Sequence, residues 1–119
     1  MANRHGQWGE DRAAAWLTAR GYRIVARNWR SRFGELDIVA WDGPTLVCVE
    51  VKARSHAQGR FGTPQDALTP NKLRRLSFLA ADFMARARVR APLRLDVVTV
   101  AGDLTPRLIR GVEPVDINS

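Results

Sequence analysis

The sequence is poor in cysteine, histidine and lysine, and it has no long hydrophobic run. Its one cysteine, Cys48, cannot form an internal disulfide, and the two isolated histidines make no Cys/His cluster of the kind that binds zinc. No apolar run reaches the roughly 18 to 20 residues that span a bilayer, and no apolar stretch follows the charged N-terminus as it would in a secretory signal. We therefore expect a protein of the reducing cytoplasm with no membrane partner.

Positive charge, in contrast, is in excess. The chain carries 19 Lys and Arg against 12 Asp and Glu, which gives a formal net charge of +7 and a pI near 11.2. Such an excess favours a polyanionic partner, because cationic side chains neutralise phosphates and release counterions. A nucleic acid is the expected partner; a basic surface that only aids solubility, or a ribosomal or membrane-surface role, is the alternative.

Lysine is unusual within this positive charge. Only Lys52 and Lys72 are lysines, and every other cationic side chain is arginine. A lysine is a compact charge with a tunable pKa, whereas arginine is forked and always charged. The lysine at position 52 therefore points to a function that arginine would not serve.

Hydrophobic periodicity and turn signals predict one α/β domain over residues 1–119, with a frayed C-terminal tail at about 114–119. The expected order is helix, three strands, helix, strand and strand, at 7–20, 22–30, 35–42, 45–53, 70–90, 93–102 and 106–115. Residues 54–69 are polar and are expected to form a mobile loop. A three-strand meander followed by a crossover helix predicts a mixed sheet flanked by helices, with one extra C-terminal strand.

Four charged residues stand inside the apolar hairpin at 35–53. If its turn is centred on Gly43-Pro44, Asp37 faces Glu50 and Glu35 faces Lys52. Opposite residues project from the same face with Cβ atoms roughly 4.5–5.5 Å apart, and alternation puts all four side chains on that face. The register therefore predicts one charged cluster rather than four separate charges.

Two interpretations of this cluster follow. Two close carboxylates repel each other, and a divalent cation between Asp37 and Glu50 would turn that repulsion into ligation. With Lys52 beside them to steady an attacking water or a developing phosphate charge, the residues match metal-assisted phosphodiester hydrolysis. The alternative is a salt-bridge network in which Glu35 pairs with Lys52.

Glu10 is a fourth carboxylate that points the same way. It shares the apolar stripe of the first helix with Ala13, Ala14 and Leu17, so it faces inward. It could reach the same metal, or it could balance the helix dipole or form half of a salt bridge.

At these residues the chain closely resembles the YraN family of small bacterial proteins. The resemblance is carried by "GEDRAAAWLTARGY", "RNWRSRFGELDIVAWDGPTLVCVEVKAR" and "TPNKLRRLSFLAADFM", and it covers nearly the whole chain. That family is similar in turn to the archaeal Holliday junction resolvases of the PD-(D/E)xK nuclease superfamily. The resemblance implies a restriction-endonuclease-like αβββαβ core.

The resemblance also implies roles for particular residues. Asp37 matches the superfamily acid and Glu50-Val51-Lys52 the (D/E)xK element, which implies Asp37, Glu50 and Lys52 as catalytic residues. Glu10 joins Asp37 and Glu50 as a ligand of Mg²⁺ or Mn²⁺. Leu36 stands where the superfamily pattern has proline, and Glu35 belongs to the YraN pattern alone, so its role is left open.

The predicted function is a Mg²⁺-dependent nuclease acting on DNA, including branched DNA. The alternative is a nucleic-acid-binding or protein-interaction module on a nuclease fold, with little or no turnover. Cleavage of a four-way junction would require a homodimer to place two sites. The basic residues expected to contact nucleic acid are Arg30, Arg32, Arg54, Arg60, Lys72 and Arg75.

Overall fold

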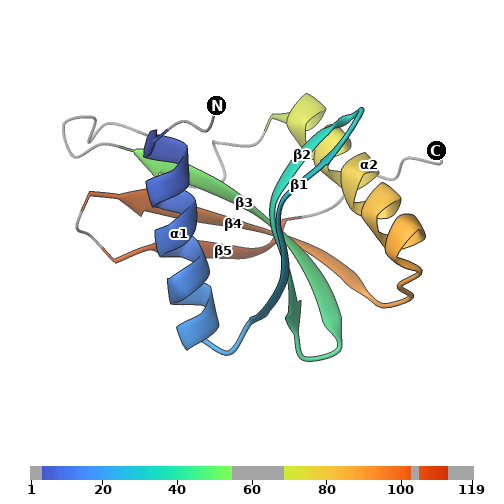
Figure 1. Ribbon diagram of the computed structural model, residues 1–119, viewed down its shortest axis with the longest axis horizontal. Coiled ribbons are helices and arrows are strands. Elements are labelled where there is room, and N and C mark those ends of the chain that lie inside the picture. Colours follow the sequence, from blue (N-terminus) through green and yellow to red (C-terminus); the bar gives the residue numbers. More distant parts are fainter. Residues whose placement is uncertain (1–3, 55–68, 103–104, 113–119) are drawn as a thin grey trace.

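A five-stranded sheet with one helix against each face makes up the computed structural model (Figure 1). The structure describes residues 4–54, 69–102 and 105–112. The elements are α1 (Arg4–Ala19), β1 (Arg23–Ser31), β2 (Gly34–Asp42), β3 (Thr45–Arg54), α2 (Pro70–Ala87), β4 (Leu93–Ala101) and β5 (Arg107–Val112). This order confirms the predicted fold class. The loop predicted at 54–69 and the tail at 114–119 fall almost entirely outside the described residues.

The sheet is mixed, with its strands in chain order. β3 and β4 are parallel, and the other neighbouring pairs are antiparallel. The turn between β2 and β3 has the predicted centre, because Trp41 pairs with Leu46 and Gly43 has a φ of +59°. A positive φ costs glycine little, so this residue sets the register of the hairpin.

The two helices cover opposite faces of the sheet and define two core clusters. On the α1 face, Ala13, Ala14 and Leu17 pack against alternate residues of the central strands, among them Val47 and Val49. On the α2 face, Leu76, Leu79, Ala80 and Phe83 pack against the other set, among them Leu46 and Cys48. Both faces of β3 are therefore buried, as expected for a strand with a parallel neighbour between two helices.

The limits of the helices differ slightly from those predicted. α1 begins at Arg4 rather than at residue 7. α2 ends at Ala87 rather than near residue 90, because Arg88 adopts a left-handed conformation and its N–H bonds back to the last turn. Ala87 is exposed, whereas Leu79 and Ser77 are buried. Thr69 caps α2, since its hydroxyl accepts a hydrogen bond from the Lys72 N–H.

Three of the four tryptophans serve packing. Trp29 meets Phe83 edge to face at 5.3 Å, and Trp16 and Trp41 lie against the two core clusters. Trp8 is the exception, since it is 41% exposed and lies beside Arg12. Neither described helix is long and apolar enough to cross a membrane.

Candidate metal and nucleic-acid site

The candidate site lies where β2 leaves β3. Their ladder runs only from Asp42–Thr45 to Ile38–Val49, while β3 continues along β4 as far as the pair Arg54–Ala101. Beyond this point the β1–β2 hairpin leans toward α2 and β3 runs toward α1 (Figure 1). Leu36 and Ile38, which strict alternation would put on one face, belong to opposite core clusters. Asp37 therefore occupies the position at which the strands part.

Asp37 is held by the backbone of β3. Its Oδ2 accepts a hydrogen bond of 2.8 Å from the Val51 N–H. Burial and the neighbouring Glu50 carboxylate raise the pKa of Asp37 to about 7. The predicted approach of Asp37 to Glu50 is observed, and it leaves Asp37 able to gain or lose a proton near neutral pH.

Both lysines of the chain converge on Glu50. The Oε2 atom of Glu50 lies 3.3 Å from the Nζ of Lys52 and 2.6 Å from the Nζ of Lys72. Burial and the adjacent Lys72 lower the pKa of Lys52, although Glu50 opposes them. Burial alone would lower the pKa of Lys72 too, but its ion pair with the Glu50 carboxylate outweighs burial and raises it. Lys72 was predicted only as a nucleic-acid contact, and its place beside Glu50 is new.

Glu10 reaches this region because α1 packs unusually close to β3. A Cβ atom on Gly9 would lie 2.5 Å from the Cβ of Ala53, so only glycine permits the approach. Glu10 is buried, as its stripe position predicted, and burial raises its pKa although Arg27 opposes the shift. Its Oε1 accepts hydrogen bonds from Arg27 Nε at 3.0 Å and Asn28 Nδ2 at 2.9 Å. The salt-bridge alternative for Glu10 is thus realised in this structure.

Sequence reasoning missed what Arg27 and Asn28 do. Neither residue is among the site residues that the sequence predicts. The available signal was the asparagine itself: Asn28 has a φ of +53°, and asparagine is one of the few residues that adopts this conformation readily. This backbone turn within β1 accompanies the hydrogen bond from its side chain to Glu10.

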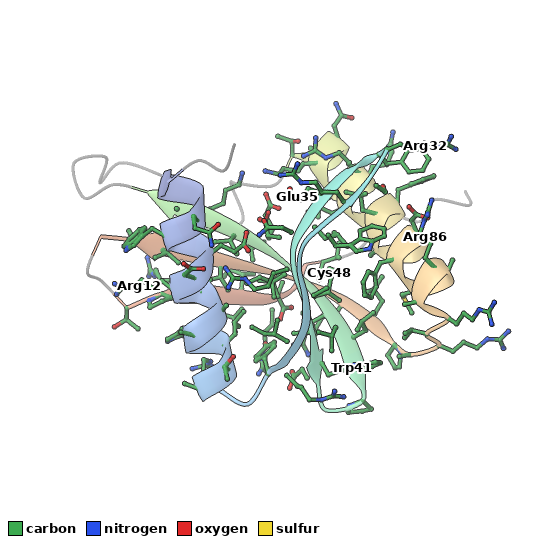
Figure 2. All side chains as sticks on the ribbon, in the orientation of Figure 1. Arg12, Arg32, Glu35, Trp41, Cys48 and Arg86 are labelled. Carbon is green, nitrogen blue, oxygen red and sulfur yellow. The ribbon has the colours of Figure 1, made fainter. Side chains whose placement is uncertain are left out.

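The predicted pairing of Glu35 with Lys52 is wrong. Glu35 forms an ion pair of 2.6 Å with Arg30, which lies opposite it in the β1–β2 ladder. The pairing fails because β2 has already parted from β3 at this level. Glu35 still adds to the negative potential at Glu10, and Figure 2 shows it on the hairpin below Arg32.

The donor chemistry of the site fits a divalent cation held by two carboxylates. Mg²⁺ commonly takes one or two protein carboxylates and completes its octahedron with waters and phosphate oxygens, which Asp37 and Glu50 would allow. Within the described part of the chain, no three Asp, Glu, His or Cys side chains lie together as a ready-made metal group. Glu10 would have to release Arg27 and Asn28 to serve as the third ligand.

The remaining predicted residues are distributed as follows. Arg30 and Arg32 lie on the β1–β2 hairpin and Arg75 on α2, all three exposed. Arg60 and the side chain of Arg54 lie outside what the structure describes. Cys48 is buried core, as expected, and burial raises the pKa of its thiol to about 12.

Asp96 is the partner of an arginine. It is 1% exposed and accepts hydrogen bonds from Arg94, the Tyr22 hydroxyl and the Gly111 N–H. Arg94 also pairs with Asp42 at 2.8 Å. These contacts join β2, β4 and β5 in a polar network that does not include the candidate site.

A model of the uncharacterised protein family UPF0102 matches residues 9–100. The chain belongs to this family. It is 50% identical to UPF0102 protein STH1475 of Symbiobacterium thermophilum over 92% of this chain and 96% of the relative. A UPF0102 protein of Beutenbergia cavernae is 48% identical over 90% and 93% of the two chains, and one of Phocaeicola vulgatus is 40% identical over 93% and 90%. The matched region contains Glu10, Asp37, Glu50 and both lysines.

Proposed function

We propose that this UPF0102 protein is a metal-dependent nuclease that acts on DNA, including branched DNA. The observation that carries the proposal is the pair of the partly buried Asp37 and the buried Glu50, beside the only two lysines of the chain. A carboxyl whose pKa is raised by burial and by a neighbouring carboxylate, beside tunable ammonium groups, is typical of sites that do chemistry.

Each side chain has a role in phosphodiester hydrolysis. Asp37 and Glu50 would hold Mg²⁺ or Mn²⁺, with Glu10 as a further ligand once it turns from Arg27. When bound, such an ion supplies Lewis-acid activation of the phosphate and an activated water. Lys52 would orient the attacking water or balance charge on the phosphate, and its ammonium position 3.3 Å from Glu50 supports this role. Lys72 would bind a non-bridging phosphate oxygen.

A specific observation favours the second candidate, a nucleic-acid-binding module with little or no turnover. Glu50 is already paired with two ammonium groups, and Glu10 with Arg27 and Asn28, so these carboxylates are satisfied without a metal. The net charge of +7 serves a binding module equally well.

A cleavage panel separates the two candidates. The protein is incubated with Mg²⁺ or Mn²⁺ and labelled linear, single-stranded, flapped and four-way DNA, with EDTA as the blank. We expect the wild type to cleave at least one substrate. The cleavage rate should fall by about 100-fold or more in Asp37→Asn, Glu50→Gln and Lys52→Ala, because each removes a metal ligand or charge stabilisation.

Arg86→Ala is the matched control for lost positive charge, since Arg86 is exposed at the far end of α2 and pairs only with Asp82 among the contacts that the structure describes. Its cleavage rate should stay within about 2-fold of the wild type, a surface change of small effect. Circular dichroism checks that each variant is folded. DNA binding without cleavage by the wild type, unchanged in the three site variants, would favour the binding module instead.

A further inference from the structure

Two phenylalanines from separate elements meet on the molecular surface. Phe33 lies in the turn between β1 and β2 and is 39% exposed, and Phe78 on α2 is 42% exposed. Their ring centroids are 4.7 Å apart with an interplanar angle of 66°. We call this pair the aromatic platform. It presents ring surface to solvent at a fixed position, because the hairpin and the helix each hold one ring.

The surroundings of the aromatic platform are positively charged. The guanidinium of Arg32 lies 4.9 Å from the centroid of Phe33, and Arg32 stands at the hairpin tip beside α2 (Figure 2). Segments 30–34 and 72–78 contain five Arg and Lys residues and no Asp or Glu. A basic surface with exposed aromatic rings suits a single-stranded nucleic acid, whose phosphates meet the cations while its bases stack on the rings.

One face of α2 connects the aromatic platform to the carboxylates. Lys72, Arg75 and Phe78 are spaced three residues apart, so they lie along one side of the helix. Lys72 contacts Glu50 at 2.6 Å, and Arg75 passes beside Gly34 of the hairpin, where an added Cβ would lie 3.7 Å from its Cδ. Six residues of helix rise about 9 Å, which equals two to three nucleotides at a spacing of 3.4 Å.

We propose that the aromatic platform binds an unpaired base two or three nucleotides from the phosphate held at Lys72, so that the substrate is DNA with single-stranded character, such as a flap. The position of that phosphate rests on the proposed function, whereas the stacking itself requires no cleavage. Arg30 already pairs with Glu35, and Lys72 with Glu50. An extended protein partner would have to be acidic to supply counterparts for Arg32, Arg74 and Arg75, whereas a phosphate backbone supplies them at regular spacing.

Binding measured in EDTA tests the stacking separately from any cleavage. Fluorescence anisotropy compares a labelled 20-nucleotide single strand with a blunt duplex of the same sequence, at one salt concentration. We expect Phe33→Ala/Phe78→Ala to weaken single-strand binding by roughly 5- to 100-fold, the effect of losing one stacked base, and to change duplex binding by less than about 2-fold.

Two variants control for folding and for plain hydrophobicity. Phe33→Leu/Phe78→Leu keeps apolar side chains of similar size but has no ring face, so it should lose single-strand affinity as the alanine pair does. Val25→Ala removes another exposed apolar side chain, 44% exposed on β1, and should bind both DNAs like the wild type. A 2-aminopurine base in the single strand should be quenched by the wild type and not by either double variant.

Each remaining outcome overturns the proposal. Equal loss of single-strand and duplex binding in the alanine pair would mean that the rings merely support the hairpin. Full affinity in the leucine pair would mean apolar contact without stacking. If sedimentation instead shows a wild-type dimer that the alanine pair dissociates, with DNA affinity unchanged, a second copy occupies the rings.

The cleavage panel keeps this proposal distinct from the proposed function. If the wild type never cleaves DNA but the phenylalanine double variants lose its preference for single strands, the proposed nuclease activity is contradicted and the aromatic platform is supported. If metal-dependent cleavage is lost in Asp37→Asn, while substitution of both phenylalanines changes neither cleavage nor single-strand binding, the proposed nuclease activity is supported and the aromatic platform is contradicted.

Discussion

At the scale of single residues, the chemistry of the site turns on the proton of Asp37. This carboxyl is partly buried beside Glu50, and its pKa of about 7 lies well above the ordinary value of 3.8. Between these two pH values the folded protein holds more protons than the unfolded chain. The free energy of unfolding therefore falls as the pH rises from about 4 to about 7, and the cost persists at higher pH.

Asp37→Asn should remove this cost. In EDTA at pH 8 we expect the variant to melt at least about 4 °C above the wild type, the shift that roughly 1 kcal/mol gives a domain of this size. The difference should shrink toward pH 4, where both states of the wild type bind the proton. Thermal unfolding monitored by circular dichroism across this pH range provides the measurement.

Added metal gives the second half of this test. At pH 8, Mg²⁺ or Mn²⁺ should raise the melting temperature of the wild type, because a ligand that binds only the folded state stabilises it. Added metal should not change the melting temperature of Asp37→Asn. A stability difference that does not vary with pH, together with no response to metal in either protein, would leave the salt-bridge network as the explanation of the cluster.

At the scale of elements, the site depends on how closely α1 approaches β3. Gly9 permits this contact, since a Cβ there would overlap that of Ala53 at 2.5 Å, and Glu10 is the next residue. The helix thus carries its buried carboxylate to the strand that bears Glu50 and Lys52. A shift of α1 would change the distance between the two carboxylates before it disturbed the rest of the core.

Gly9→Ala tests this contact by the sign of its effect. Alanine favours a helix over glycine by about 1 kcal/mol, so without the contact the variant would be more stable. With it, we expect a net loss of about 1–2 kcal/mol and a melting temperature lower by roughly 4–10 °C, because overpacking forces the backbones apart. Chemical denaturation measures the free energy of unfolding directly, and a gain in stability would contradict the close approach.

The elements could be predicted from the sequence because their signals are local. Gly43 with its positive φ, the Thr69 cap and the stripe through Leu17 each act within a few residues. The site was only partly predictable. The approach of Asp37 to Glu50 followed from the hairpin register, but the pairing of Glu35 with Arg30 depends on where β2 parts from β3. The arrival of Lys72 from α2 depends on tertiary packing and has no local signal.

At the scale of the whole molecule, two polar clusters have different roles. The cluster around Asp96 supports the fold, and the cluster around Asp37 carries the proposed chemistry. Asp96 is fully bonded to Arg94, Tyr22 and Gly111, which ties together strands distant in sequence. The site around Asp37 instead sets like charges beside each other. Removing one partner of a fully paired buried charge is costly because the other charge is left uncompensated, whereas a charge in a repulsive pair is retained at a cost to stability.

Asp96→Asn should therefore destabilise the protein. It removes the charge that balances Arg94 in a buried position, and we expect a loss of about 3 kcal/mol in the free energy of unfolding. Urea denaturation checks the size of the effect. At a temperature where the variant stays folded, its DNA affinity in EDTA should match that of the wild type. An unchanged free energy of unfolding would mean that Asp42 alone satisfies Arg94.

The pairing of both lysines with one carboxylate also gives the protein a built-in chemical reporter. Apart from the α-amino group, Lys52 and Lys72 are the only primary amines that the sequence carries. Acylating reagents that target amines will therefore modify this chain at Glu50's two neighbours and almost nowhere else. The extent of acylation of each lysine, followed by mass spectrometry, would record any occupant of the site without a label on the ligand.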